Sequence, residues 1–361
     1  MTRVGVLPDR SFWRGRSVLL SGHTGFKGAW LAIWLGRLGA RVTGIALPPA
    51  SDAPSLYALA GVDADVCSHF CDIGDAAALR SLVADAKPEI VFHLAAQAQV
   101  REGYRQPLAT LATNVMGTAH LLDALRGLDS VRVAVLVTTD KVYENRGALW
   151  PFRESDPLGG HDPYSASKAA CEIVAASYRA SFLSEAGIAV ATARAGNVIG
   201  GGDWATDRLI PDAVRAWQGG YALRLRRAEA VRPWQHVLEP LAGYLLLAQR
   251  LWSEPQLAEA YNFGPRTDEA ASVATVIELA RQAYGCGEVE YAVQPEGPHE
   301  ASHLTLETAR AAHGLGVRPR WSLHEAVLRT MNWYRALADG GHARELCLAD
   351  LLAYEGGACR T

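Results

Sequence analysis

The sequence predicts an α/β protein whose core is a doubly wound parallel sheet, with a smaller, mostly helical lobe toward the C-terminus. Three observations support this fold class. Strand-like and helix-like segments alternate through the first half of the chain, the strands are short apolar runs, and a glycine-rich turn follows the first of them. The 361 residues are enough for a sheet domain and a second lobe.

The elements of the first half are expected in a regular order. We predict strands over Ser17–Ser21, Arg41–Ala46, Val66–Cys71, Ile90–Leu94, Val131–Thr138 and Ile188–Ala193, and helices over Phe26–Leu38, Asp75–Ala86, Leu108–Leu125 and Pro163–Leu183. A β-α-β rhythm of this kind places helices on both faces of a parallel sheet.

The pattern becomes less regular after about Gly196. Helices are predicted over Arg208–Trp217, Val237–Leu251, Val273–Tyr284 and Leu323–Ala336, and strands over Tyr221–Leu225 and Glu259–Phe263. We expect the last of these strands to rejoin the main sheet, so that the two parts of the chain are interleaved.

Composition and spacing exclude several classes of protein. The formal net charge of −3 offers no basic surface to nucleic acid, and no run of about 18 apolar residues predicts a membrane span. The cysteines lack C-x-x-C spacing and the histidines lack ligand spacing, so we assign no metal. Without a secretory signal, a reduced cytoplasmic protein is expected.

A dinucleotide site is predicted at the turn after the first strand. The run from Gly22 to Gly28 has the spacing G-x-x-G-x-x-G. Glycine permits the tight turn and lets the backbone approach a pyrophosphate, while the following helix offers free N–H groups at its start. The acid expected at the end of the second strand is absent from Thr43–Pro49, so this rule does not decide between NAD and NADP.

Residues after later strands are expected to complete this cofactor site. Asp72 follows the third strand and is a candidate either for the adenine amine or for a helix N-cap. The candidate cofactor residues are Gly22, His23, Gly25, Phe26, Lys27, Gly28, Asp72, Ile73, Leu94, Ala95, Ala96, Gln97, Asn114, Tyr164 and Lys168. The dinucleotide-binding domain is therefore predicted over residues 1–196, with a returning segment near 236–265, and the substrate-binding lobe over residues 197–361.

Three side chains predict hydride chemistry at a sugar carbon. Tyr164 and Lys168 are four residues apart and share one helix face. Tyrosine, with a reference pKa of about 10, is a poor base at neutral pH, but a nearby ammonium and a positive nicotinamide ring favour the phenolate. Thr139 closes the preceding strand and can share a substrate oxygen with Tyr164. As an isolated pair, Tyr164 and Lys168 would be typical of a surface helix.

With these motifs in place, the chain resembles the extended short-chain dehydrogenase/reductase family over nearly its whole length, and within it the nucleotide-sugar 4,6-dehydratases. The stretches that carry the resemblance are GHTGFKG (22–28), TDKVYEN (139–145), GGHDPY (159–164), RAGNVIGGGDW (194–204) and RPWQHV (232–237). Similar enzymes that act on dTDP-glucose carry Thr-Asp-Glu where this chain has Thr139, Asp140 and Lys141. This lysine favours the branch that acts on CDP-glucose.

The resemblance implies a Rossmann-type lyase that keeps NAD tightly bound and serves deoxysugar biosynthesis. The implied reaction is oxidation at C4 of the sugar, loss of water across C5 and C6, and reduction at C6. The resemblance implies that Tyr164 removes the proton of the C4 hydroxyl and that Asp140 protonates the leaving C6 hydroxyl. Two roles stay open for Lys141: a neutral amine that removes the C5 proton, or an ammonium that stabilises negative charge at C5.

The nucleotide-sugar substrate is expected to contact the second lobe. Arg208 and Arg232 are candidates for its diphosphate, because a guanidinium fork matches phosphate geometry. Arg208 is equally typical of an exposed helix start. The full set of candidate substrate residues is Gln99, Tyr104, Asn197, Arg208, Arg232 and His236.

Assembly and the exact reaction stay open at this point. The family resemblance implies a homodimer or homotetramer packed through helices 108–125 and 163–183. A 4,6-dehydratase of another nucleotide sugar, a nucleotide-sugar 4-epimerase or a reductase would share this fold, and no residue identifies the nucleotide base. A non-catalytic NAD sensor is disfavoured, because it has no need of Thr139, Tyr164 and Lys168 together.

Overall fold

The computed structural model describes residues 6–51, 53–147, 149–294, 297 and 300–356. Its centre is a seven-stranded parallel sheet in the order β11-β6-β5-β4-β1-β2-β3. The strands are β1 (Ser17–Ser21), β2 (Arg41–Ala46), β3 (Val66–Phe70), β4 (Ile90–His93), β5 (Val133–Val137), β6 (Ala189–Ala195) and β11 (Ala260–Phe263). The predicted doubly wound fold class is confirmed, and the late strand β11 pairs with β6 at one edge.

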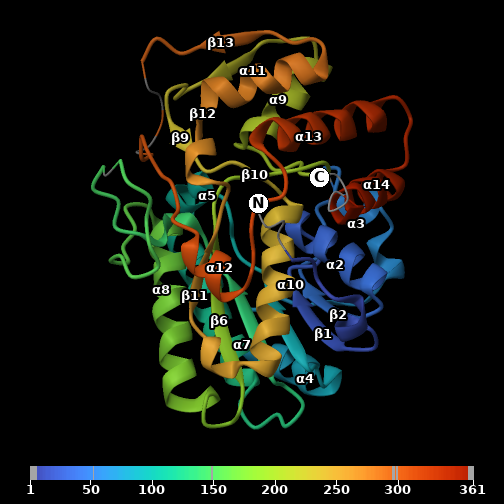
Figure 1. The fold of residues 1–361 in the computed structure, drawn as a ribbon, viewed down its shortest axis with the longest axis vertical. Coiled ribbons are helices and arrows are strands. Elements are labelled where there is room, and N and C mark those ends of the chain that lie inside the picture. The colour runs from blue at the N-terminus through green and yellow to red at the C-terminus, as the bar shows by residue number, and fades with distance from the viewer. Residues whose placement is uncertain (1–5, 52, 148, 295–296, 298–299, 357–361) are drawn as a thin grey trace.

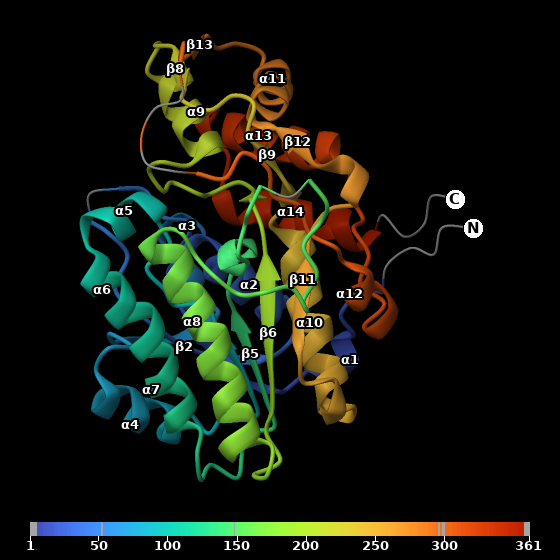
Figure 2. The ribbon, with the colours of Figure 1, turned by 90° about the vertical axis from the view of Figure 1, so that its left-hand side faces the viewer.

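Helices cover both faces of this sheet (Figures 1 and 2). Side chains of β1 alternate between the faces: Val18 and Leu20 belong to the larger core, and Leu19 belongs to the second core on the opposite face. The larger core contains α2 (Phe26–Leu38) and α10 (Leu238–Ser253), and the second lies beneath α4 (Ala76–Ala86), α7 (Gly117–Ala124) and α8 (Pro163–Tyr178). Burial on both faces explains why the strands are continuous apolar runs.

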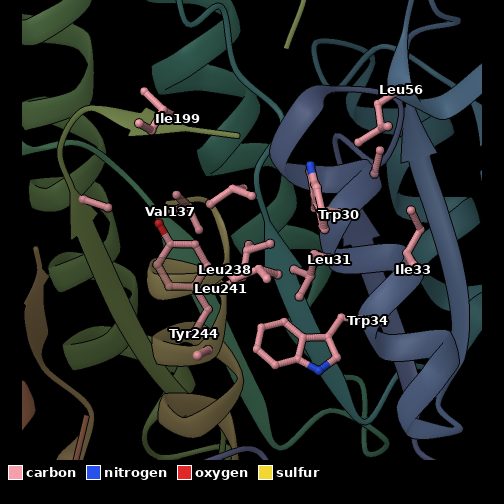
Figure 3. Close-up of a cluster of buried hydrophobic side chains, with 14 of the residues drawn as sticks. Trp30, Leu31, Ile33, Trp34, Leu56, Val137, Ile199, Leu238, Leu241 and Tyr244 are labelled. Atoms are coloured by element: carbon pink, nitrogen blue, oxygen red, sulfur yellow. The ribbon is translucent and has the colours of Figure 1, made fainter. Parts of the chain in front are cut away.

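The larger core is formed where α2 faces α10 and the sheet (Figure 3). Trp30 and Trp34 of α2 and Tyr244 of α10 are fully buried there, and Val137 of β5 lies near Tyr244. The helix α2 ends at Gly39, which adopts the left-handed conformation (φ +86°) favoured at helix ends. This packing fixes α2, and with it the glycine-rich turn at its N-terminus.

The second half of the chain adds a smaller group of elements toward which the carboxyl ends of the strands point (Figure 2). Its helices are α9 (Leu209–Gln218), α11 (Val273–Tyr284), α13 (Leu323–Ala338) and α14 (Ala343–Gly356), and its short strands are β7 (Val198–Ile199), β8 (Leu223–Leu225), β9 (Val231–Arg232), β10 (Gln235–His236), β12 (Ala271–Ser272) and β13 (Val289–Tyr291). A short helix, α12 (Ala309–Gly314), also belongs to this part, and the short helices of the first half are α1 (Arg10–Trp13), α3 (Leu56–Leu59), α5 (Val100–Arg105) and α6 (Pro107–Leu111). The mostly helical character predicted for this part is confirmed. None of the helices in the described ranges is long and apolar enough to cross a membrane.

Two helices predicted as continuous contain a turn of π-helix. The segment predicted over 108–125 is α6, the π turn η2 (Ala112–Met116) and α7; the one predicted over 163–183 is α8 followed by a π turn, η4 (Arg179–Leu183). Such turns occur frequently at functional sites, and η2 contains Asn114.

A buried carboxyl fastens α10 to the C-terminal helices. Glu239 Oε1 accepts the backbone N–H groups of Arg320 (3.0 Å) and Trp321 (2.8 Å), and its Oε2 accepts the hydroxyl of Tyr354 (2.8 Å). Burial raises the pKa of Glu239 to about 7, although these three hydrogen bonds oppose the rise. The folded protein therefore binds a proton here more tightly than the unfolded chain, whose glutamate has a pKa of about 4.5.

We expect Glu239→Gln to remove this pH dependence. Because the folded pKa is the higher one, the unfolded chain holds fewer protons between pH 4.5 and 7, and the contribution of Glu239 to stability falls as pH rises through that window. Glutamine can still accept both backbone N–H groups through Oε1 and can donate its amide N–H to the Tyr354 hydroxyl, but it does not titrate. The stability of this variant relative to the parent should therefore increase from pH 5 to pH 8, by up to about 3 kcal/mol. Urea unfolding at both pH values measures this; identical pH dependence in the two proteins would contradict it.

Candidate functional site

The order of the sheet places the site at the carboxyl end of β1. From β1 the chain proceeds to β2 and β3 in one direction and then returns to β4, β5 and β6 on the other side. Ligands of open α/β sheets bind outside the carboxyl ends of the strands at this point of reversal. The turn after β1, the segment after β4 and the segment after β5 all meet there.

The glycine-rich turn is built so closely that side chains would not fit. Gly22 has φ +80°, and a Cβ there would lie 2.7 Å from the Ala95 amide nitrogen. A Cβ on Gly28 would lie 2.0 Å from the carbonyl oxygen of Gly22. Gly25 is the N-cap of α2, is exposed, and leaves a Cβ no nearer than 3.4 Å to any neighbour. The turn therefore presents bare backbone and the N-terminus of α2, as a pyrophosphate requires.

Two alanine substitutions should separate folding of this turn from binding. Gly25→Ala should leave the melting temperature near that of the parent but weaken NAD binding about tenfold or more, because the methyl group occupies the face that meets the pyrophosphate. Gly28→Ala should lower the melting temperature as well, since its Cβ overlaps the turn itself. Calorimetric titration with NAD and thermal melts test both; parental NAD affinity in Gly25→Ala would contradict the predicted contact.

His23 closes the turn on the side of β2 and β3 with an uncharged ring. Its ring lies over Gly44 of β2, where a Cβ would be 2.5 Å from the ring. Its Nε2 is 2.5 Å from the Ser68 hydroxyl, which also contacts the Tyr57 hydroxyl at 2.9 Å. Burial lowers the pKa of His23 to about 4, so the ring is neutral at pH 7. The ring uses the space that the missing side chain of Gly44 leaves.

The segment after β4 is held by Asn114. The side-chain amide of Asn114 exchanges hydrogen bonds with the Gln97 backbone N–H (2.8 Å) and carbonyl (3.0 Å) and donates to the Ser167 hydroxyl (2.8 Å). Leu94 and Ala95 donate their backbone N–H groups to the Ser21 hydroxyl at 3.1 and 3.2 Å. These bonds connect residues 94–97 to the end of β1 and to α8.

The remaining candidate cofactor residues differ in how they are placed. Asp72 is exposed and accepts the Gly74 N–H (2.8 Å), while the N-cap of α4 is Asp75. Ile73 is buried against Gly117. Asp72 therefore keeps one carboxylate oxygen for a ligand.

Thr139, Asp140 and Lys141 follow β5 directly. The Thr139 hydroxyl donates to Asp140 Oδ1 at 3.0 Å, and Lys141 Nζ lies 3.4 Å from the same oxygen. Asp140 is fully buried, and its Oδ2 has no hydrogen-bond partner among the residues that the structure describes. A Cβ on Gly196 would lie 2.5 Å from this Oδ2. The site thus holds a carboxyl and an amine in contact, with one carboxyl oxygen left unsatisfied.

Helix capping brings Tyr164 to the same place. Asp162 caps α8 by accepting the Ser165 N–H at 3.0 Å, and Pro163 is the first helical residue. The Thr139 hydroxyl lies close enough to the phenol of Tyr164 to influence its pKa. Burial raises the pKa of Tyr164 to about 12, and the Thr139 hydroxyl opposes this rise. Additional positive charge is therefore needed to make this phenol a base.

Lys168 lies one turn after Tyr164 on α8 and is also buried. Its Nζ donates to the Val137 carbonyl oxygen at 3.1 Å. Burial lowers the pKa of Lys168, while the negative charge of Glu172 opposes that change. The predicted trio of Thr139, Tyr164 and Lys168 is thus assembled at the end of β5.

A cluster of positive charges surrounds these groups. Burial lowers the pKa of Lys27 to about 7, and the charges of Arg208, Lys168 and Lys141 contribute to this shift while Asp140 opposes it. The charges of three cations thus act on Lys27. Such an excess of positive charge suits a ligand with several negative charges.

Two of the candidate substrate residues in the second half are held in position. Arg208 Nη1 pairs with Asp203 Oδ2 at 2.8 Å, and the charge of Arg208 acts on Tyr164. Arg232 is buried and donates to the carbonyl oxygens of Val231 (2.8 Å) and Ala301 (2.5 Å).

Asn197 presents an unused acceptor. Its Oδ1 is buried and has no hydrogen-bond partner within the described ranges. A buried amide oxygen without a partner costs free energy unless a ligand supplies a donor.

Two further candidates lie beside the start of α8. Gln99 precedes α5, and Tyr104 lies on that helix with 38% of its surface exposed. Helix α5 packs closely on α8, since a Cβ on Gly103 would lie 3.1 Å from the Tyr164 amide nitrogen. Gln99 and Tyr104 therefore belong to a segment that packs against the start of α8, where Tyr164 lies.

His236 does not belong with the candidate substrate residues. It is fully buried, and its ring packs edge-to-face on Trp30 and Trp321 at centroid distances of 6.1 and 4.8 Å. Its Nδ1 accepts the Leu238 N–H at 3.3 Å, and burial lowers its pKa to about 3. We therefore correct its predicted role: an aromatic cage holds His236 in the core.

The sequence reasoning missed the polar groups behind the site. Glu172 and Arg194 form a buried ion pair at 2.8 Å, and Arg194 also contacts the Tyr143 hydroxyl. Two signals were present: Glu172 follows Lys168 by one helical turn, and Arg194 is a charge inside an otherwise apolar strand. A buried charge in such a strand requires a partner.

Comparison with known proteins identifies the family. A family model described as GDP-mannose 4,6 dehydratase matches residues 19–330. The chain belongs to this family. It is 45% identical over 339 residues to the CDP-glucose 4,6-dehydratase of Salmonella typhimurium, a match that covers 92% of this chain and 94% of that protein. It is 34% identical over 268 residues to a dTDP-glucose 4,6-dehydratase of Streptomyces antibioticus, covering 73% and 75%. The resemblance inferred from the motifs is confirmed.

Solved structures show the same fold. A dTDP-glucose 4,6-dehydratase of Streptomyces venezuelae, solved with NAD bound, aligns with a TM-score of 0.76 and 26% identity over 90% of this chain and 98% of its own. A UDP-glucose-4-epimerase of Stenotrophomonas maltophila aligns with a TM-score of 0.78 and 22% identity, over 90% and 100%. The second likeness concerns the fold alone.

Proposed function

We propose that the chain is an NAD-dependent nucleotide-sugar 4,6-dehydratase, a hydro-lyase that converts CDP-glucose to CDP-4-keto-6-deoxyglucose. The observation that carries this proposal is the contact of Asp140 and Lys141 beside the hydroxyls of Thr139 and Tyr164. A 4-epimerase needs Thr139 and Tyr164 but has no use for Asp140 and Lys141. The 45% identity to a CDP-glucose 4,6-dehydratase supports the same substrate.

The residues around the glycine-rich turn fit NAD. Gly22 and Gly28 leave room only for backbone, Gly25 opens the N-terminus of α2, and the neutral ring of His23 packs over Gly44 of β2. NAD, when bound, accepts a hydride from C4 of the sugar and returns it to C6. We assign Asp72 to the adenine, residues 94–97 to the neighbouring cofactor surface, and Lys168 to the ribose hydroxyls.

Tyr164 acts on the C4 hydroxyl. As the phenolate it takes the hydroxyl proton while Thr139 hydrogen-bonds the same oxygen. The charge of Arg208 stabilises that phenolate, and we assign the same role to the ammonium of Lys168, one helical turn away on α8. Removal of the proton makes loss of hydride from C4 possible.

Asp140 and Lys141 act together at C6 and C5. When Lys141 gives its proton to Asp140, the ion pair becomes a neutral amine and a carboxylic acid with no change in total charge. These are the two forms that elimination needs: Lys141 removes the C5 proton, and Asp140 donates a proton to the leaving C6 hydroxyl. The buried Oδ2 of Asp140, which has no hydrogen-bond partner among the described residues, is the oxygen that we assign to the leaving hydroxyl.

The positive cluster and Asn197 serve the nucleotide half of the substrate. We assign Lys27, Arg208 and Arg232 to the diphosphate, and the free acceptor Asn197 Oδ1 to a substrate hydroxyl or amine. Gln99 and Tyr104, on the side of α8, are assigned to the sugar.

Incubation with CDP-, dTDP-, UDP- and GDP-glucose tests the proposed reaction. We expect loss of one water by mass spectrometry and the alkaline absorbance of a 4-keto sugar, most rapidly with CDP-glucose. A product of unchanged mass would indicate an epimerase, and preference for another nucleotide would contradict the assigned substrate.

The organisation of the chain is part of the proposal. We assign residues 1–196, with the returning segment near 236–265, to a dinucleotide-binding domain, and residues 197–361 to an interleaved substrate-binding lobe. A cytoplasmic location is supported by the cysteines of the described ranges, all of which are free thiols.

We further infer a homodimer or homotetramer that packs through helices 108–125 (α6, η2 and α7) and 163–183 (α8 and η4), which lie on one face of the sheet (Figure 2). Leu108 of α6, Met116 of η2 and Ile173 of α8 are 81%, 51% and 61% exposed. Exposed apolar side chains on adjoining helices are typical of a protein–protein contact surface. Sedimentation of Ile173→Glu should show a monomer, whereas Leu352→Glu, on α14 and 54% exposed in the parent, should sediment like the parent; a monomeric parent would contradict the assembly.

A further inference from the structure

Behind the site lies a buried ion pair that no step of the proposed reaction uses. Glu172, on α8, is 5% exposed, and both of its carboxylate oxygens are occupied. Its Oε1 accepts the Thr138 hydroxyl at 2.5 Å, and its Oε2 accepts the Thr192 hydroxyl at 2.6 Å and Arg194 Nη2 at 2.8 Å. The pair therefore joins α8 to the ends of β5 and β6.

Arg194 extends the connection to a third segment. Its Nη1 donates to the Tyr143 hydroxyl at 3.0 Å and to the Glu154 carbonyl oxygen at 3.2 Å. The Tyr143 hydroxyl donates in turn to Asn262 Oδ1 at 2.6 Å, which brings in the edge strand β11. The guanidinium carbon also lies 5.1 Å from the centre of the Tyr143 ring.

Each segment that supplies a reacting group contacts this pair. Thr138 immediately precedes Thr139, Tyr143 follows Lys141 by two residues, and Glu172 is on the helix of Tyr164 and Lys168. Removing two charges from water costs free energy that apolar side chains would not incur, so a pair in this position is poorly explained by stability alone. Neither partner is within hydrogen-bonding reach of the reacting residues in the contacts that the structure shows.

We propose that Glu172 and Arg194 are positioning residues that set the geometry of Thr139 and Tyr164 about the substrate C4 oxygen, and of Lys141 about C5. This inference rests on the proposed dehydratase function. The hydroxyls of Thr139 and Tyr164 come from the end of β5 and from α8. Glu172 hydrogen-bonds across that junction through Thr138, beside the bond from Lys168 to the Val137 carbonyl oxygen. A displacement of 1 Å at such a junction is enough to slow a reaction about 100-fold.

Three substitutions test the pair at increasing severity. Thr138→Val removes only the hydroxyl that donates to Glu172. Tyr143→Phe removes only the hydroxyl that accepts from Arg194 and donates to Asn262. Glu172→Gln removes the negative charge of the pair. We expect kcat to fall about three- to tenfold in the first two variants and about 100-fold in the third. KM for CDP-glucose should stay within about twofold, because no substrate contact is lost.

The kinetic isotope effect separates positioning from general destabilisation. With CDP-glucose deuterated at C4, a misplaced Tyr164 makes hydride loss slower relative to other steps, so the isotope effect on kcat should rise in Thr138→Val and Glu172→Gln. Glu239→Gln is the matched control: it replaces another buried carboxyl, one that contacts Arg320, Trp321 and Tyr354 and none of the reacting residues, and should leave kcat and the isotope effect unchanged. Glu172→Asp, which keeps the charge, should recover part of kcat.

The outcomes are distinct. An inactive parent would overturn the proposed function itself. An active parent with Thr138→Val and Tyr143→Phe at parental kcat would overturn the positioning role, whether or not Glu172→Gln folds. A rise in KM with an unchanged isotope effect would also overturn it, because it would place the pair in substrate binding.

Discussion

Tyr164→Phe is expected to lower kcat about 100- to 10,000-fold, the usual contribution of a positioned acid–base group. Phenylalanine preserves the packing of α8 against Gly103 but offers no oxygen to the C4 hydroxyl. KM for CDP-glucose should change little, because the diphosphate contacts lie elsewhere. Steady-state kinetics, with the 4-keto product followed in alkali, measure both constants.

The same variant should also stop exchange of the C5 hydrogen with solvent. That hydrogen becomes acidic only after C4 has been oxidised, so a block at Tyr164 precedes every later step. Thr139→Val is the matched variant, since it removes the partner hydroxyl and leaves the phenol, and we expect a smaller loss. Rapid C5 exchange in Tyr164→Phe would show that another group performs the oxidation.

Lys141→Met is expected to allow oxidation at C4 but to slow C5 exchange and water loss about 100-fold or more. The methionine side chain fills similar space without an amine. Deuterium uptake from heavy water, followed by mass spectrometry, measures the exchange directly. Parental exchange in Lys141→Met would contradict the assignment of Lys141 as the base.

Lys141→Arg and Lys141→Glu distinguish the two roles that the sequence left open. Arginine keeps the positive charge but does not deprotonate in proteins. If a neutral amine is required, C5 exchange in Lys141→Arg should therefore be as slow as in Lys141→Met. Glutamate can act as a base without the positive charge and should recover part of the exchange. The reverse order, with arginine fast and glutamate slow, would show that Lys141 acts as a charged stabiliser.

Most of the sheet and the residues at its carboxyl edge could be predicted because the signals were local. Apolar runs bounded by turn residues predicted β1, β2 and β5 within a few residues, and Gly39 and Asp162 mark the ends of α2 and α8 by ordinary capping chemistry. Thr139 and Tyr164 meet because both lie at the carboxyl edge of one parallel sheet, which the β-α-β order already implied.

The parts that could not be predicted depend on contacts between distant segments. Arg208 stands at a helix start in sequence, and only Asp203 and the folded loop turn it toward Tyr164. His236 looked like a ligand residue next to Arg232, yet Trp30 and Trp321, far away in the chain, enclose it. The short strand pairs of the second half contain too few residues to produce a periodic pattern.

In the proposed reaction, one site oxidises C4, removes water across C5 and C6, and reduces C6 of a single CDP-glucose molecule. Conversion of CDP-glucose deuterated at C4, followed by mass spectrometry and NMR of the product, tests this reaction directly. We expect loss of one water with the deuterium recovered at C6. Deuterium released to solvent, or a product that has lost no water, would contradict it.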